Sequence, residues 1–172
     1  MATRIRQMLD EANSRADRDG LTGVKNKGYY NEYIVALQQR SDSENVAYAV
    51  VMMDINYLKL INDTYGHNAG DELIRSAATL ICRIFAHSPV FRIGGDEFCV
   101  ILQGGDYNLR ETLLPRLEHE MTEAENIPGG KLSIACGMAD HPASSNASYD
   151  DIFRQADARM YERKRRIKQI ES

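Results

Sequence analysis

Residues 90–103 read VFRIGGDEFCVILQ, in which two apolar runs flank a pair of glycines and two acidic residues. Apolar runs on either side of a Gly-Gly pair are typical of a β-hairpin. We therefore predict strands over 90–93 and 98–103, joined by a turn in which Gly94 and Gly95 adopt positive φ. Two adjacent carboxylates, Asp96 and Glu97, open the second strand.

A second apolar run, residues 46–53, ends at Asp54. It is rich in valine and does not alternate, which predicts a central strand buried on both faces. The end of such a strand can present a carboxylate at a crevice. Asp54 and the hairpin carboxylates can then meet across neighbouring strands, in an all-oxygen site suited to Mg²⁺. Alternation sends Asp96 and Glu97 to opposite faces, so spacing alone does not decide which of them meets Asp54.

The remaining periodicities predict helices around these strands. An amphipathic helix over 4–16 carries a narrow apolar stripe of Ile5, Met8, Leu9 and Ala12, which needs a partner. The element order predicts an α+β sandwich with four strands in an antiparallel or mixed sheet and helices mainly on one face. The other expected elements are helices over 27–39, 57–65, 69–86, 107–122 and 149–167, and a strand over 132–138.

Composition narrows the class of protein. The chain has 172 residues, 43% hydrophobic and 27% charged, enough for one ordinary core. A net charge of −4 argues against a nucleic-acid partner bound through a broad basic surface. Cys82, Cys99 and Cys136 lack metal-site spacing and are expected to be reduced core residues of a cytosolic protein. No run approaches the ~20 apolar residues of a membrane span, so a cytoplasmic location is expected, with any anchor outside this sequence.

Five segments resemble one family. Residues 92–98, RIGGDEF, are similar to the signature of GGDEF diguanylate cyclases, and further similar segments lie in the family's order at 19–26, 54–63, 65–71 and 156–164. The resemblance covers 19–168 and implies a GGDEF domain over 19–172 preceded by a linker helix over 1–18. It also implies a ferredoxin-like, polymerase-palm-like sandwich of the nucleotidyl cyclase type, with a central, mainly antiparallel sheet and surrounding helices.

The resemblance implies a reaction and its metal site. Two GTP molecules condense into cyclic di-GMP with loss of two pyrophosphates, using Mg²⁺ or Mn²⁺ and a homodimer, under an upstream sensor absent from this sequence. The implied metal ligands are Asp54, Asp96 and the main-chain carbonyl of Ile55, with Glu97 a further candidate. The implied catalytic residues are Asp96, Glu97 and Lys59, whose ammonium would stabilise charge developing on the phosphate.

The resemblance also implies substrate contacts. Asn62 and Asp71 match guanine-reading positions, and a carboxylate suits the adjacent N–H donors of guanine. Asp71 has a second interpretation, as the third residue of a helix capped by Asn68. Lys164 and Lys168 match positions that hold the β- and γ-phosphates, although a solvated basic tail gives the same pattern. The implied substrate-binding residues are Asn62, His67, Asp71, Gly94, Gly95, Lys164 and Lys168.

Several positions depart from the family pattern. Asn56 replaces an aspartate, Leu58 replaces an aromatic residue, and Lys168 stands where an arginine would supply a bidentate fork. Residues 85–88, FAHS, lack the Arg-x-x-Asp of a product-inhibition site, and we expect Phe85 to lie in the core. The alternative functions are a degenerate GGDEF module without turnover, or a synthase that uses adenine nucleotides. The intact acidic and lysine positions disfavour the first, and Asp71 disfavours the second.

Overall fold

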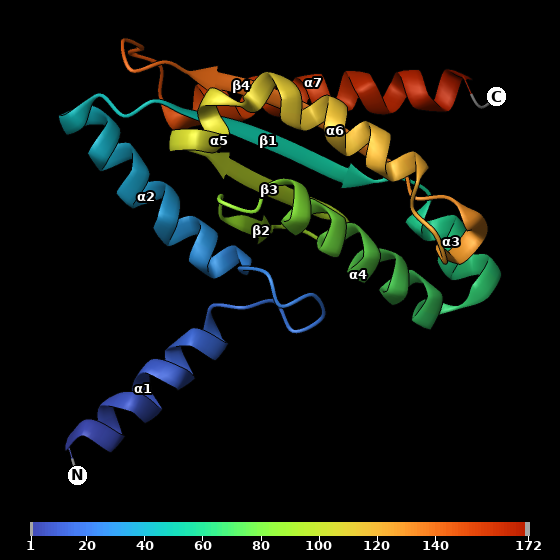
Figure 1. Cartoon of the computed structure of the whole chain (residues 1–172), viewed down its shortest axis with the longest axis horizontal. Helices are drawn as coiled ribbons and strands as arrows, with labels where there is room; N and C mark the ends of the chain where they lie inside the picture. Colours follow the sequence, from blue (N-terminus) through green and yellow to red (C-terminus); the bar gives the residue numbers. More distant parts are fainter. Residues whose placement is uncertain (1, 171–172) are drawn as a thin grey trace.

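The computed structural model describes residues 2–170, in which a four-stranded sheet is surrounded by helices (Figure 1). The elements follow the predicted order, except that the helix expected over 107–122 is two helices. They are α1 (Ala2–Ala16), α2 (Lys27–Glu44), β1 (Tyr48–Ile55), α3 (Leu58–Tyr65), α4 (His67–Ile84), β2 (Val90–Arg92), β3 (Glu97–Leu102), α5 (Gly104–Asn108), α6 (Arg110–Thr122), the 3₁₀ turn η1 (Pro128–Gly130), β4 (Ile134–His141) and α7 (Tyr149–Ile170).

The sheet has the strand order β2-β3-β1-β4, and every neighbouring pair is antiparallel. The predicted central strand is confirmed, because all eight residues of β1 are buried. Since β1 lies between β3 and β4, its carboxyl end meets the start of both neighbours. Asp54 therefore reaches the edge of the sheet next to the β2–β3 turn.

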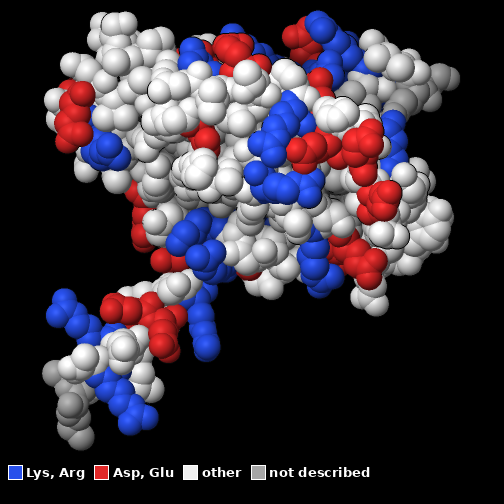
Figure 2. All heavy atoms as spheres, viewed as in Figure 1, with Lys and Arg blue, Asp and Glu red and all other residues white. Residues whose placement is uncertain are grey.

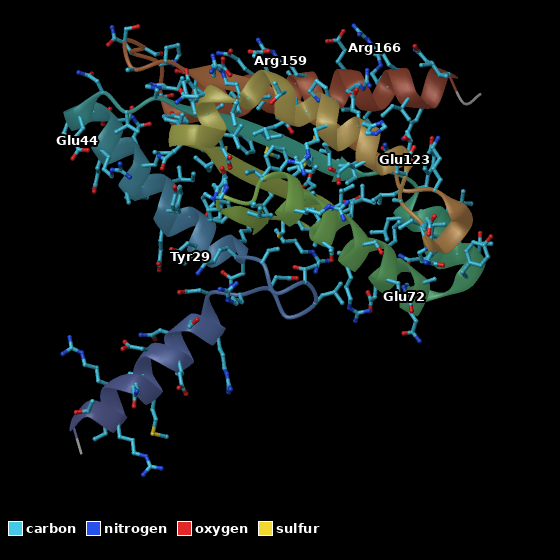
Figure 3. All side chains as sticks on the ribbon, viewed as in Figure 1. Tyr29, Glu44, Glu72, Glu123, Arg159 and Arg166 are labelled. Atoms are coloured by element: carbon cyan, nitrogen blue, oxygen red, sulfur yellow. The ribbon has the colours of Figure 1, made fainter. Side chains whose placement is uncertain are left out.

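Helices cover both faces of the sheet, so the expectation that they lie mainly on one face is wrong. Val51, Met53 and Ile55 share one core with α4 and α6, whereas Val50 and Met52 share another with α2 and α7. The unbroken apolar run of β1 is the physical reason, because residues that alternate between two faces can all be apolar only if both faces are covered. Figure 3 shows side chains filling the space on both sides of the sheet.

The β2–β3 turn exists, but not for the predicted reason. Neither Gly94 nor Gly95 has positive φ. A Cβ atom at Gly94 would lie 2.6 Å from Glu97 Oε2, so this glycine leaves room for the glutamate to fold back over the turn. Nothing lies within 4 Å of the Cβ position at Gly95, which leaves that side of the turn open.

Helix α4 begins at His67, two residues before the expected start, and its N-cap is Gly66 with φ 90°. Asn68 therefore does not cap the helix, and the interpretation of Asp71 as a residue at the third helical position is wrong. Asp71 is the fifth residue of α4 and is partly exposed. Cys82 on the same helix is exposed, contrary to the expectation that all three cysteines lie in the core.

Helix α1 extends away from the sheet (Figure 1), and it carries both basic and acidic side chains (Figure 2). The apolar stripe predicted for this helix is exposed, with 55% of Ile5, 63% of Met8 and 58% of Leu9 accessible. The stripe has no apolar partner in the rest of the described chain. Among residues 2–170, no helix is both long and apolar enough to cross a membrane.

A close approach of α7 to β4 determines where the end of α7 lies. A Cβ atom at Gly137 would lie 2.1 Å from Met160 N and 2.2 Å from Ala156 O, both main-chain atoms of α7. Real Cβ atoms do not approach backbone so closely, so only glycine permits this packing. The helix consequently runs against β4 and β1 and carries its last turns beyond the end of β1.

Gly137→Ala should lower the free energy of unfolding by about 3 kcal/mol, because the added methyl group forces α7 away from the sheet. Urea denaturation followed by circular dichroism measures the change. Gly20→Ala is the matched control, since nothing lies within 4 Å of its Cβ position, and it should change stability by less than about 1 kcal/mol. Equal stability of the two variants would contradict the close packing of α7.

Candidate functional site

Two carboxylates face each other at the end of the central strands. Asp54 of β1 is the direct cross-strand partner of Glu97 of β3. Side chains of directly opposed residues project from the same face of a sheet, here the face covered by α7. The register thus decides what the spacing left open, because Glu97 is the carboxylate that shares a face with Asp54.

Helix α7 brings positive charge to this pair. Lys164 Nζ lies 3.0 Å from Asp54 Oδ1, and both side chains are mostly buried. A cavity of about 600 Å³ opens beside them. Four of its lining residues were not predicted from the sequence, although they lie on the same helix as the lysines. The cavity is lined by Asp54, Glu97, Asp157, Met160, Tyr161, Lys164, Arg165 and Lys168.

The electrostatics of the cavity favour a cation between the carboxylates. Burial raises the pKa of Asp54, the charge of Asp96 adds to that effect, and Lys164 opposes it. Burial also raises the pKa of Glu97, and the charges of Asp54, Asp96 and Asp157 raise it further. Like charges held in a partly buried site resist ionisation, and a divalent cation would relieve this repulsion.

Asp96 lies in the turn before β3, and its main chain is fixed to β1. Ile55 N donates a hydrogen bond of 2.9 Å to the Asp96 carbonyl. This bond holds Asp96 close enough for its charge to affect both Asp54 and Glu97. The turn and the end of β1 consequently form one edge, which carries all three predicted acidic residues.

The residues present fit a divalent metal. Asp54 Oδ1 is buried and accepts no well-aligned hydrogen bond, although Lys164 lies near it as an ion pair. Glu97 faces it, and Asp96 lies at the adjoining turn. Within residues 2–170 no three His, Cys, Asp or Glu side chains are grouped as a complete metal cage. Mg²⁺ commonly takes one or two carboxylates and completes its shell with water and substrate phosphate, so two acidic ligands are sufficient.

Asn56, the departure next to Asp54, has a structural partner. Its side chain is buried, and Nδ2 donates a hydrogen bond of 3.0 Å to Ser133 Oγ. Asn56 N also donates to the Ser133 carbonyl at 2.9 Å. The amide therefore ties the end of β1 to the residue before β4, an interaction that sequence analysis had no means of finding.

Gly94 and Gly95 lie in the β2–β3 turn, whereas the predicted substrate residues Asn62, His67 and Asp71 lie at the corner between α3 and α4. Asn62 of α3 packs onto Gly70 of α4, where a Cβ atom would collide with the Asn62 amide. Asp71 follows Gly70 directly, so the two predicted guanine contacts belong to one corner. His67 and Lys59 are exposed on the same helix pair. None of these residues lines the cavity at Asp54, so the predicted substrate positions form two regions, one on each side of the end of β1.

An ion pair braces the hairpin turn against the loop before α2. Arg92 Nη1 lies 3.0 Å from Asp19 Oδ2, and Arg92 Nη2 donates to the Gly95 carbonyl at 2.7 Å. Asp19 also accepts a hydrogen bond of 2.7 Å from the Thr22 hydroxyl. Residues of the first and fourth family-like segments, 19–26 and 92–98, thus hold each other, although the sequence alone assigned them no role.

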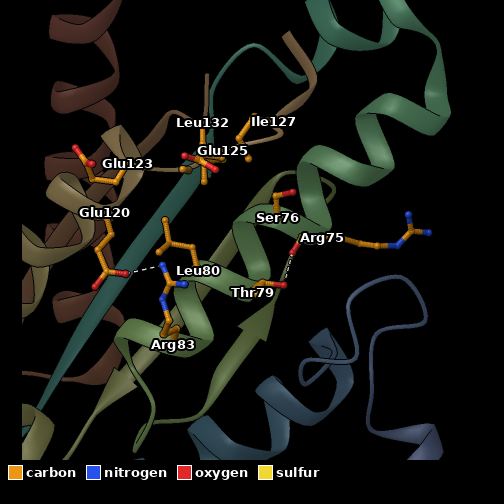
Figure 4. Close-up of a pocket in the computed structure, with 11 residues that line it drawn as sticks. Arg75, Ser76, Thr79, Leu80, Arg83, Glu120, Glu123, Glu125, Ile127 and Leu132 are labelled. Carbon is orange, nitrogen blue, oxygen red and sulfur yellow. Dashed lines mark hydrogen bonds and ion pairs between the residues drawn. The ribbon is translucent and has the colours of Figure 1, made fainter. Parts of the chain in front are cut away.

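A separate cavity of about 520 Å³ lies between α4 and α6 (Figure 4). Arg83 in this cavity donates a hydrogen bond of 2.5 Å to the Glu120 carboxylate. Glu120 also forms an ion pair with Arg116. Phe85 is 1% exposed, which confirms that it belongs to the core. Neither Arg83 nor residues 85–88 therefore forms the Arg-x-x-Asp arrangement, in agreement with the sequence.

Comparison with known proteins points to one family. The profile described as "Diguanylate cyclase, GGDEF domain" matches residues 16–169. Diguanylate cyclase DgcS of Shewanella oneidensis is 29% identical over 157 residues, which are 90% of this chain and 51% of that protein. Probable diguanylate cyclase DgcT of Escherichia coli is 33% identical over 158 residues, 87% of this chain and 34% of that protein. The chain thus spans half or less of these relatives' lengths.

A solved structure has the same fold. The coiled coil and GGDEF domain of DgcB from Caulobacter crescentus, in complex with c-di-GMP, superposes with a TM-score of 0.83. The sequences are 26% identical, and the match covers 95% of this chain and 88% of that one. The predicted sandwich with a central antiparallel sheet is confirmed by this likeness and by the strand pairing.

The brace at Asp19 should give the fold a pH-dependent contribution. Partial burial alone would raise the pKa of Asp19, but hydrogen bonds from Thr22 and Arg92 outweigh it and lower the pKa below 3.8. A lowered folded-state pKa contributes stability that is present above the unfolded value and is lost as the pH falls through the folded pKa. Asp19→Asn should therefore be less stable than the parent at pH ~7, and the difference should shrink below pH ~4.

Urea denaturation across that pH range measures the difference. The control is Asp10→Asn on the exposed face of α1, which should follow the parent protein at every pH. A stability difference for Asp19→Asn that stays constant with pH would rule out the carboxylate as its source.

Proposed function

Because the chain belongs to the GGDEF family of diguanylate cyclase domains, we propose that it condenses two GTP molecules into cyclic di-GMP and releases two pyrophosphates. The observation that carries the proposal is the Asp54–Glu97 pair beside Lys164 and Lys168 in one cavity. Acidic groups for a metal and basic groups for phosphates thus lie within reach of one bound nucleotide.

The reaction transfers a nucleotidyl group. The 3′-hydroxyl oxygen of one GTP bonds to the α-phosphorus of the other and gives up its proton to water, while the bond from that phosphorus to the bridging oxygen breaks and pyrophosphate leaves with the electron pair. The same attack in the opposite direction closes the ring and releases the second pyrophosphate. A divalent cation held by Asp54, Asp96 or Glu97, and the Ile55 carbonyl would supply Lewis-acid activation of the hydroxyl and the phosphate. Such chemistry needs positioning and positive charge more than a protein nucleophile.

The basic residues of α7 bind the substrate's phosphates in this proposal. Lys164 follows Tyr161 by three residues, and Lys168 follows Lys164 by four. These spacings place all three side chains on the helix face that lines the cavity. Lys164 contacts Asp54 here, so it can exchange this carboxylate for a phosphate oxygen when nucleotide and metal enter. Lys59, exposed on the first turn of α3, stabilises the charge that develops on the transferring phosphate.

Guanine is read at the α3–α4 corner. Asp71 can accept hydrogen bonds from N1–H and N2–H of guanine, whereas adenine presents an acceptor and a donor on the matching edge. Asp71 does not take part in capping α4, because Gly66 is the N-cap of this helix. Asn62 stands beside it through its contact with Gly70, and exposed His67 lies next to the same corner.

Each chain carries one half of the catalytic centre. One cavity binds one GTP, so the second GTP comes from a facing copy, and two equal half-sites imply a two-fold homodimer. The stripe of Ile5, Met8 and Leu9 supports this arrangement, because an exposed apolar seam is suited to pairing with a second helix of the same kind.

Asp54→Asn and Asp96→Asn should each reduce turnover below roughly one hundredth, because one ligand charge of the metal site is lost. The fold should persist, since removing one of several facing carboxylates relieves repulsion. Product chromatography and pyrophosphate release with GTP and Mg²⁺ measure the activity, and thermal unfolding checks the fold.

Asp63→Asn is the matched control for these variants, because Asp63 is exposed on α3 outside the cavity. It should retain full activity. Full activity of Asp54→Asn would contradict the assignment of Asp54 as a metal ligand. An inactive parent protein that still binds GTP would instead identify a regulatory module without turnover.

Specific activity should rise with protein concentration until the dimer is saturated. Met8→Glu places a charge on the apolar stripe of α1 and should raise the half-maximal concentration by at least ~10-fold, because burial of a methionine stabilises an interface by about 1.5–3 kcal/mol. Gln7→Glu adds the same charge on the opposite side of α1 and is the control. A linear dependence of rate on concentration, from nanomolar to micromolar protein, would contradict the half-site arrangement.

A further inference from the structure

Arg165 differs from the other arginines of α7 in having no partner. Within residues 2–170, its side chain makes no hydrogen bond or ion pair, and it is exposed. The other four are all engaged. They are Arg154 with Asp150 at 2.6 Å, Arg159 with the Met138 carbonyl at 2.6 Å, Arg163 with Glu118 at 2.7 Å and Arg166 with Glu162 at 2.7 Å.

Arg165 also lines the cavity at Asp54, which the four engaged arginines do not. It follows Tyr161 by four residues and precedes Lys168 by three, so these side chains share one side of the helix. Tyr161 is 60% exposed on that side. Arg166 lies on the outer side of α7 (Figure 3). The guanidinium therefore stands at the mouth of the cavity with its donors available.

Arg165 adds a third positive charge to the wall of the cavity that α7 forms. Lys164 contacts Asp54, and the positive charge of Lys168 also acts on Asp54. Arg165 lies between these two lysines in the sequence and lines the same cavity. The three cations are gathered within residues 164–168 on one wall, where the phosphates of a nucleotide would lie.

We propose that Arg165 binds the terminal phosphates of GTP, next to Lys164 and Lys168. This inference rests on the proposed function. A guanidinium offers a rigid fork of N–H donors that fits two phosphate oxygens, whereas an ammonium acts as a point charge. Arg165 thereby supplies the bidentate contact that Lys168 does not provide, from a position three residues earlier on the helix.

Contacts to the terminal phosphates are similar in the bound substrate and in the transition state, since the reacting atoms lie at the α-phosphate. Loss of such a contact raises KM and leaves kcat nearly unchanged. A charge-assisted hydrogen bond contributes enough for about a 10-fold change in affinity. Arg165→Gln should therefore raise the KM for GTP about 10-fold, and Arg165→Lys should recover only part of this loss.

The matched control is Arg166→Gln, which removes the same charge from the neighbouring residue, where the guanidinium is paired with Glu162. Its KM should equal that of the parent. Thermal unfolding verifies that each variant is folded. A KM that rises equally in both variants would show a general effect of charge and overturn the assignment to Arg165.

Binding measurements separate this inference from the proposed function. Isothermal titration calorimetry with inorganic triphosphate should show weaker binding to Arg165→Gln than to the parent, whereas binding of GMP, which lacks the terminal phosphates, should be unchanged. Equal triphosphate affinity of both proteins overturns the role of Arg165 even if turnover is observed. A parent protein without turnover, whose triphosphate binding still depends on Arg165, overturns the cyclase activity and supports the phosphate contact.

Discussion

Two carboxylates face each other across the β1–β3 ladder, and the pairing of the two strands fixes the distance between their main chains. Asp54 and Glu97 are direct partners in the register, and burial raises the pKa of both. Acidic groups held in this way repel each other, so the arrangement is favourable only with positive charge close by. Lys164 provides it within the chain, at 3.0 Å from Asp54. The same repulsion makes the pair suited to a divalent cation once a nucleotide contributes further oxygen atoms.

The position of that lysine depends on a contact one to two turns earlier in the helix. Main-chain atoms of Met160 and Ala156 approach Gly137 so closely that β4 can carry no side chain there. Because a helix is rigid, the distance between α7 and β4 at Gly137 determines where Lys164, Arg165 and Lys168 lie one and two turns later. Packing of the core at Gly137 therefore determines where the residues proposed to bind phosphate lie.

Smaller polar contacts hold the three pieces of the site in place. Arg92 connects the hairpin turn to Asp19, Ile55 N bonds the carbonyl of Asp96, and Asn56 bonds Ser133. Each contact joins segments distant in sequence, and each involves a residue within four positions of an acidic residue of the site. Because these contacts fix the backbone around the site, the acidic side chains keep their positions although their charges repel each other.

Much of the fold could be predicted from local patterns. The valine-rich run ending at Asp54 indicated burial on both faces, and two apolar runs separated by a Gly-Gly pair indicated a hairpin, although neither glycine adopts the positive φ expected of it. Helices appeared where apolar residues recur every three or four positions, with errors of a few residues at the ends. The family followed from five motifs in order, because several independent matches in register rarely coincide.

The sequence by itself determined the fold class, the family and the identity of the acidic and basic residues, since these depend on residue type and on short-range periodicity. Only the tertiary structure decided which carboxylate meets Asp54, because strand register is set by pairing between distant segments. It likewise decided that Gly94 makes room for Glu97, that Gly66 rather than Asn68 caps α4, and that Arg165 reaches the cavity without a partner of its own. Each of these outcomes depends on what lies nearby in space, which spacing along one segment does not encode.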